Sequence, residues 1–237
     1  LYYPTQGFET PTPIAEWYER YQKQCPLVVK DWEAFSDPYH WTYTNYVDHQ
    51  SLAETQLNEL MKRIEHPDYA AGLSEEWRGT LENYVVPFVY PGHGLQMCAA
   101  YVGQMIPSAR VAICSTFQAA DEVRRINHFA FLAGAIRQTY PTFADHRQTT
   151  WETSPFWQPL RQYIEILLTT YDWGEAFTAL DLVLKPRLET AMIDALTRAA
   201  TRHGDTDFAR LLQAQQEDSL RHQTQALSLF DFLVLQE

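Results

Sequence analysis

The sequence predicts an all-α fold, a helical bundle that follows an extended N-terminal arm. Two observations lead to this class. Only 9 of the 237 residues are glycine, and a sandwich of short strands needs more turn glycines than that. Several long stretches are rich in Ala, Leu, Gln, Glu and Arg, which favour helices. Four of these stretches are apolar on most faces, which is typical of helices at the centre of a bundle.

The arm is predicted over residues 1–50, whose composition differs from the rest. Five prolines in this segment prevent one long helix. Twelve aromatic residues accompany them, and they pack either on the chain's own bundle or on a partner chain, where aromatic anchors are common. Both alternatives remain open. The residues expected at subunit interfaces are Tyr2, Tyr3, Phe8, Trp17, Phe35, Trp41 and Tyr43.

The bundle domain is predicted over residues 51–237, where the pattern is helical. Pro107 separates two central helices, and Ser108 is the expected N-cap of the second. Pro186 is expected to kink a later helix, and Gly204-Asp205 forms the last turn. The predicted helices span residues 51–66, 73–86, 94–106, 109–137, 157–170, 174–201 and 205–232.

The four longest predicted helices come as two antiparallel pairs. The first pair lies before residue 138 and the second after residue 173, so a long connection joins the two hairpins. Two helical hairpins with one long crossover form the ferritin-like arrangement, which ribonucleotide reductase also has.

Ferritin-like dimetal sites take one Glu from each of two helices and a Glu-x-x-His pair from each of the other two. The 109–137 helix has Glu122 in place, but Arg125 stands where the His is needed. Arginine stays protonated and offers no lone pair to a metal. On the last helix His222 is in place, but the residue three positions before it is Ser219.

The single carboxylates are also incomplete. No Asp or Glu occurs between Glu82 and Asp121, so the helix before Pro107 supplies no ligand. On the 174–201 helix, Glu175 and Asp181 are the candidates. We therefore expect no metal and no catalytic residue in this chain. Glu122, Arg125, Ser219 and His222 are interpreted as vestigial positions, with Glu122 and Arg125 forming a buried ion pair.

Charge and composition exclude several classes of function. The net charge of −12 disfavours nucleic-acid binding. The three cysteines Cys25, Cys98 and Cys114 lack disulfide or zinc-site spacing and are expected to be buried thiols in a reducing cytoplasm. Residues 83–109 carry no charge, but prolines and glycines interrupt their apolar run, so no membrane span is predicted.

Four stretches carry a resemblance to a known family. They are FSDPYHWTY (35–43), QMCAAYVGQMIPSAR (96–110), FQAADEVRR (117–125) and DWGEAFTALDLVLKP (172–186). The sequence resembles the β subunits of the hydroxylase component of bacterial multicomponent, carboxylate-bridged diiron monooxygenases, in the toluene, alkene and phenol branch. The resemblance extends over nearly the whole chain, which is shorter at both ends than expected for the family.

The resemblance implies an α2β2γ2 hydroxylase whose catalytic α subunit holds the diiron centre. The β subunit would be non-catalytic and would support α in the O2- and NAD(P)H-dependent hydroxylation or epoxidation of an aromatic or alkene hydrocarbon. A small γ subunit, an effector protein and a reductase or ferredoxin would complete the system. The hydrocarbon itself would be selected by α and is not encoded in this chain.

Two other hypotheses stay open at this point. The first is a stand-alone helical oxidase whose unusual metal site uses Glu122, Asp218 and His222, and it predicts metal in the isolated chain. The second is a stand-alone helical scaffold, and it predicts a stable monomer. The aromatic arm disfavours the monomer, because a large exposed apolar patch promotes association.

Overall fold

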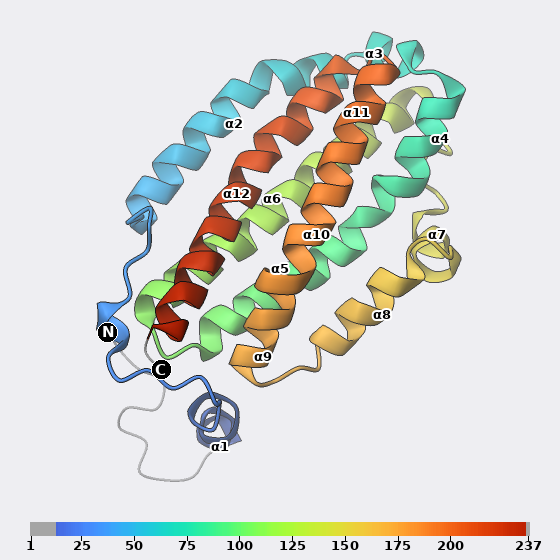
Figure 1. Ribbon diagram of the computed structural model, residues 1–237. Coiled ribbons are helices and arrows are strands. Elements are labelled where there is room, and N and C mark those ends of the chain that lie inside the picture. Colours follow the sequence, from blue (N-terminus) through green and yellow to red (C-terminus); the bar gives the residue numbers. More distant parts are fainter. Residues whose placement is uncertain (1–12, 236–237) are drawn as a thin grey trace.

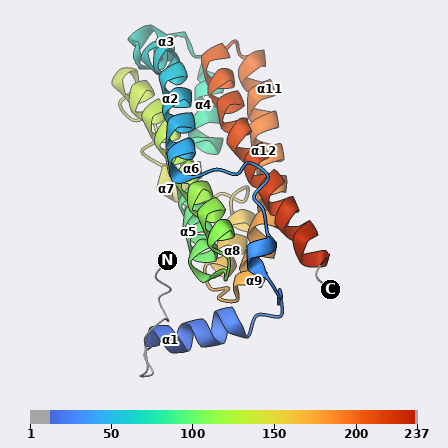
Figure 2. The same cartoon turned by 90° about the vertical axis from the view of Figure 1, so that its left-hand side faces the viewer.

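The computed structural model describes residues 13–235 of the chain. Throughout this range the secondary structure is helical, with no strand, which confirms the predicted all-α class. The long helices run side by side in one bundle, and α1 (Pro13–Tyr18) lies across its lower end (Figures 1 and 2). No helix within residues 13–235 combines the length and the apolar character needed to cross a membrane.

The first helical hairpin consists of α5 (Val89–Met105) and α6 (Ala109–Thr139). Helix α5 packs against α6, and the longer α6 continues beyond it to contact α3. Ser108 caps α6 as predicted, because its hydroxyl accepts a hydrogen bond from the backbone N–H of Val111. Gly103 lies where the two helices approach closely, since an added Cβ there would be 3.2 Å from the carbonyl oxygen of Ala112.

The second hairpin consists of a continuous helical run over residues 173–202 and of α12 (Thr206–Val234). The run contains α9 (Trp173–Phe177), α10 (Lys185–Glu189) and α11 (Ala195–Arg202). Two π-helical segments, η4 (Thr178–Leu184) and η5 (Thr190–Asp194), flank α10. A kink is predicted at Pro186, and the structure has a π-helical segment, with its wider turn, on each side of α10. Asp205 caps α12 by accepting a hydrogen bond from the N–H of Phe208.

The crossover between the hairpins contains two short helices, α7 (Arg147–Thr153) and α8 (Gln158–Leu167). Only α8 was predicted, because α7 is polar and lacks an apolar period. The buried indole of Trp157 ties the crossover to α4 (Glu75–Tyr84) by donating a 2.9 Å hydrogen bond to the carbonyl of Asn83. The predicted ferritin-like order of two hairpins and a long crossover is therefore confirmed.

Helix α2 (Tyr43–Glu65) begins before the predicted start at Ser51. Thr42 caps it by accepting a hydrogen bond from the N–H of Asn45. The early turns are helical because Tyr46 and Gln50 lie buried against α6 and α12. Helix α3 (Pro67–Gly72) follows and leads into α4.

The described part of the arm packs in part on the chain's own bundle. Phe35 is 2% exposed and meets Phe232 of α12 edge to face at 5.5 Å, while Trp32 of η2 (Trp32–Ala34) contacts Trp173. The expectation of a subunit contact at Phe35 is therefore corrected, because the core of this chain already covers its ring. Tyr43, in contrast, is 73% exposed.

Candidate functional site

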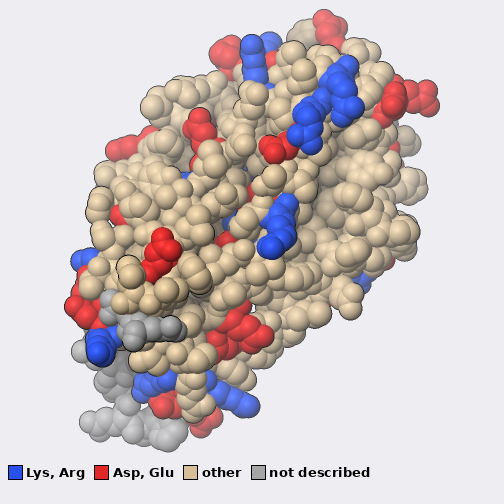
Figure 3. Space-filling view, in the orientation of Figure 1, with Lys and Arg blue, Asp and Glu red and all other residues tan. Residues whose placement is uncertain are grey.

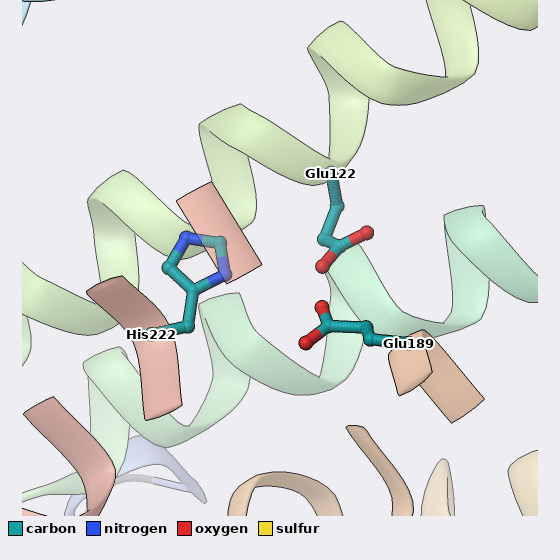
Figure 4. A group of neighbouring side chains, drawn as sticks. All are labelled: Glu122, Glu189 and His222. Atoms are coloured by element: carbon teal, nitrogen blue, oxygen red, sulfur yellow. The ribbon is translucent and has the colours of Figure 1, made fainter. Parts of the chain in front are cut away.

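The vestigial positions meet at the centre of the bundle. Glu122 and Arg125 come from α6, and Ser219 and His222 come from α12. All four are buried. Figure 4 shows that Glu122 and His222 face each other together with a third residue, Glu189 of α10. The structure thus brings together the four residues singled out from the sequence.

Two basic side chains bind both carboxylates at this centre. Lys185 Nζ lies 2.8 Å from Glu189 Oε1 and also contacts Glu122 Oε1. Arg125 Nη1 lies 3.3 Å from an oxygen of Glu122 and 3.3 Å from an oxygen of Glu189. Arg125 Nη2 also donates a 2.8 Å hydrogen bond to Ser219 Oγ. The two buried cations are therefore paired with the two buried carboxylates, as burial in a low dielectric requires.

Electrostatics stabilise this paired state. Burial alone would raise the pKa of Glu189, but the charges of Lys185 and Arg125 outweigh it and lower the pKa to about 2. Burial likewise opposes the charge of Lys185, and the two carboxylates nevertheless raise its pKa. Both partners are therefore ionised at neutral pH.

These residues do not fit the diiron centre that the fold implies. Three ligand atoms, one each from Glu122, Glu189 and His222, lie within 4.8 Å of one another. An ammonium and a guanidinium already bind both carboxylates, and helix α5 carries no Asp or Glu. Neither basic group can ligate iron, and each would repel a cation.

A second buried network surrounds Asp121. Its carboxylate accepts hydrogen bonds from the Tyr46 hydroxyl at 2.8 Å, from the Gln50 amide at 2.8 Å and from His222 Nε2 at 2.9 Å, and it is ion-paired with Arg221. Burial would raise the pKa of Asp121, but the bond from His222 and the nearby arginines lower it to about 2.

Asp218 belongs to this outer network and not to the central group. It accepts a 2.8 Å hydrogen bond from Gln50, which also binds Asp121, and it is ion-paired with Arg124. The guanidinium of Arg221 lies over the ring of Trp41, 4.4 Å from the centroid. Trp41 is therefore partly covered by its own chain.

The two carboxylates proposed for the 174–201 helix lie elsewhere. Asp181 accepts a 2.6 Å hydrogen bond from Gln118, and burial raises its pKa to about 6. Glu175 is exposed in the first turn of α9. The carboxylate that reaches the centre is Glu189, which sequence reasoning missed together with Lys185. The available signal was the Lys185–Glu189 pair, an opposite-charge pair four residues apart on one helix.

The other expected interface residues divide into two groups. Tyr2, Tyr3 and Phe8 lie outside the described residues. Trp17 is 36% exposed and donates a 3.1 Å hydrogen bond to the hydroxyl of Tyr101. Tyr43 projects from the start of α2 and keeps most of its surface free. Trp17 and Tyr43 thus retain area that a partner chain can cover.

Two helical hairpins joined by a long crossover, around a buried centre, define a protein of the ferritin-like fold. The profile of the Methane/Phenol/Alkene Hydroxylase family matches residues 16–237, and the chain belongs to this family. It is 33% identical over 230 residues to the hydroxylase component subunit beta of the toluene-4-monooxygenase system of Ectopseudomonas mendocina, covering 94% of this chain and 70% of that protein.

A more distant relative and a solved structure agree with this assignment. The chain is 23% identical over 185 residues to the phenol 2-monooxygenase oxygenase component DmpL of Pseudomonas sp. (strain CF600), covering 78% of this chain and 56% of that protein. The structure of toluene 4-monooxygenase with toluene in its resting active site matches with a TM-score of 0.92 and 32% identity, over 96% of this chain and 76% of that chain. The predicted resemblance to hydroxylase β subunits is confirmed.

The phenol hydroxylase of Pseudomonas sp. OX1 supports the fold alone. Its xenon-pressurised crystal structure matches with a TM-score of 0.85, and the match covers 91% of this chain and 66% of that chain. The sequence identity is only 18%, so this match supports the shared fold and carries no argument about chemistry.

Proposed function

We propose that this chain is the non-catalytic β subunit of a diiron monooxygenase hydroxylase. It supports a catalytic α subunit in the O2-dependent hydroxylation or epoxidation of a hydrocarbon, and the relatives favour an aromatic one. One observation carries the proposal: Lys185 and Arg125 bind both carboxylates at the centre of the bundle. An oxygen-activating centre needs open metal positions, and this arrangement offers none.

A surface suited to the α subunit lies on the first hairpin. From His93 to Gln104 on α5 and from Ile113 to Gln138 on α6, the most exposed residues are uncharged, and the partly exposed Arg137 is paired with Asp145. Interface cores are depleted in charged residues, so this face fits a large partner. Its exposed members are His93, Met97, Ala100, Gln104, Ile113, Thr116, Ala120, Val123, Asn127, Ala130, Phe131, Gly134 and Gln138.

The view in Figure 3 shows charged side chains spread over α2 and α10 to α12, where blue and red groups occur on the same face. Arg187, Arg198 and Arg202 are exposed there. The contrast supports assignment of the uncharged α5–α6 face, rather than this one, to the α subunit.

The remaining partners follow from the same proposal. The diiron centre belongs to α, and α, β and a small γ subunit form an α2β2γ2 assembly on which an effector protein and a reductase or ferredoxin act. Trp17, Tyr43 and the aromatic residues before Pro13 contribute to its contacts. The three cysteines are unpaired, which supports a reducing, cytoplasmic compartment.

Metal content and oligomeric mass test the proposal. The chain is expressed alone and then together with the α and γ genes. We expect a metal-free chain alone, and a large complex with two irons per α chain after co-expression. A stable isolated chain that holds two irons would overturn the proposal in favour of the stand-alone oxidase. A stable monomer that does not bind α would favour the scaffold hypothesis.

A further inference from the structure

An apolar groove lies between α5 and the C-terminal end of α8, with a volume of about 310 Å3. Met97 and Ala100 line it from α5, and Leu167 and Leu168 line it from the end of α8. Met97 is 45% exposed and Leu168 is 38% exposed, and none of the described residues that line the groove is charged. An exposed apolar hollow of this kind marks a contact site.

Hydrogen bonds hold the aromatic rim of this groove, which Tyr101 and Tyr171 form. The Tyr101 hydroxyl donates a 2.7 Å hydrogen bond to the carbonyl oxygen of Tyr171 and accepts a 3.1 Å hydrogen bond from the indole of Trp17. The rings of Trp17 and Tyr171 also meet edge to face, with centroids 4.8 Å apart. The rim is therefore ordered in the chain alone, which lowers the entropy cost of association. Tyrosine and tryptophan are common at the energetic centre of protein interfaces.

The groove is continuous with the uncharged α5–α6 face. Met97, Ala100 and Gln104 belong to both surfaces. A charged occupant would leave its charge buried without a partner, which is unfavourable, so an uncharged occupant fits this lining. The side chains of Gln96 and Gln104 add amide donors and acceptors to the lining, as in the polar rim of a protein interface.

We propose that this groove receives an aromatic or aliphatic side chain of the α subunit, and that this side chain anchors the contact between α and the α5–α6 face. The inference rests on the proposed function, because it takes α as the partner. Three observations carry it: the apolar lining, the ordered aromatic rim and the continuity with a face whose most exposed residues are uncharged. A volume of about 310 Å3 lies at the lower end of the range for ligand clefts, so the groove accommodates one large side chain.

A pair of substitutions at the end of α8 tests whether α uses the groove. Leu168→Arg places a charge in the groove, whereas Ile166→Arg places the same charge two residues earlier, at a position that is 60% exposed and does not line the groove. The affinity of each full chain for α is measured by titration. We expect Leu168→Arg to weaken binding at least about a hundredfold, and Ile166→Arg to bind as tightly as the unsubstituted chain.

Filling the groove from α5 is an independent test. Ala100→Trp occupies the hollow that the side chain of α would enter, so it should also weaken binding to α at least about a hundredfold. Ala195→Trp makes the same change at an exposed position of α11 and should bind α normally. Normal binding by both Leu168→Arg and Ala100→Trp would overturn the proposal.

Covalent labelling shows whether the groove is open in the chain and covered in the complex. Ala100→Cys is treated with a bulky maleimide, and the unsubstituted chain, whose three cysteines are buried, gives the background. We expect labelling of the isolated chain and protection in the complex with α. If position 100 is blocked in the isolated chain, the chain covers its own groove; if labelling is equal in both states, α leaves the groove open. Either result would overturn the proposal, and this measurement decides the question even where Leu168→Arg or Ala100→Trp does not fold.

Failure of this inference is distinguishable from failure of the proposed function. If the unsubstituted chain does not bind α at all, the proposed function is wrong and the groove assignment falls with it. Val123 lies on the same face, is 42% exposed and does not line the groove. If Val123→Arg loses binding while Leu168→Arg and Ala100→Trp retain it, α covers the α5–α6 face without entering the groove, and only the groove assignment is overturned.

Discussion

Glu122 lies at the centre of the bundle in contact with Lys185, from a helix more than sixty residues further along the chain. Glu122 is 0% exposed and Lys185 is 1% exposed. The ammonium therefore depends on this carboxylate and on Glu189 for compensation of its charge. A contact between two buried ions holds α6 and α10 in register.

Glu122→Ala is expected to damage stability and assembly rather than chemistry. Removing one member of a buried ion group leaves an uncompensated charge, which costs roughly 3–5 kcal/mol. Urea unfolding of the chain measures this loss. Glu59→Ala, on the exposed surface of α2, serves as control. A complex with normal stability and abolished turnover would instead place Glu122 in the catalytic machinery.

Asp121→Asn is expected to destabilise the chain by about 3 kcal/mol or more at pH 7, since an amide cannot replace the charge that faces Arg221. The pKa of Asp121 is lowered from 3.8 to about 2. Its stabilising contribution is therefore complete above pH 4 and disappears as the pH falls through 2. The difference in unfolding free energy between Asp121→Asn and the parent should therefore shrink as the pH falls through that interval.

Unfolding curves at several pH values would check the Asp121 prediction. Asp48→Asn, at an exposed position of α2, provides the control and should show no such dependence. A difference in stability that stays constant from pH 5 to pH 2 would show that the carboxylate charge is not the cause.

Asp181→Asn should act in the opposite direction. Burial raises the pKa of Asp181 from 3.8 to about 6, so its ionised form costs up to about 3 kcal/mol above pH 6. This cost disappears as the pH falls from 6 to 4. The variant should therefore be more stable than the parent at pH 8 and nearly equal at pH 4. Calorimetric melting at both pH values tests this, with Asp231→Asn as exposed control, and an unchanged melting temperature at pH 8 would refute it.

Phe35→Ala and Tyr43→Ala separate the two roles of the arm. Phe35 is buried in this chain, so its truncation should cost roughly 3–5 kcal/mol of unfolding free energy. Tyr43 is exposed, so its truncation should leave the stability of the chain unchanged and weaken assembly with the other subunits. Melting curves and pull-down with α measure the two effects. Equal stability losses in both variants would contradict this division.

The helices and their order could be predicted from the sequence because apolar periods, Pro107 and Ser108 mark them locally. The start of α2 could not be predicted, because residues 43–50 are polar and aromatic and have no apolar period. They are helical because Tyr46 and Gln50 are buried against α6 and α12. Glu122, Arg125, Ser219 and His222 were found through a spacing rule.

The same spacing rule did not identify Lys185 and Glu189. The two π-helical segments that flank α10 change the number of residues per turn, and this alters which side chains face inward. The rule for a single carboxylate fixes no spacing along the 174–201 helix, so it does not distinguish Glu189 from the expected Glu175 and Asp181. The position of a charged residue inside a bundle then depends on backbone geometry that composition and spacing do not encode.

Val123→Arg tests the uncharged face as the contact with α. Val123 lies midway along α6 and is 42% exposed, so an arginine there is solvated in the isolated chain and should not affect its folding. In a complex the same charge would be buried without a partner, which costs several kcal/mol. We expect binding to α to weaken at least about a hundredfold. Ile166→Arg, on exposed α8, is the matched control and should bind normally. Loss of binding in the control alone would move the contact from the α5–α6 face to the crossover.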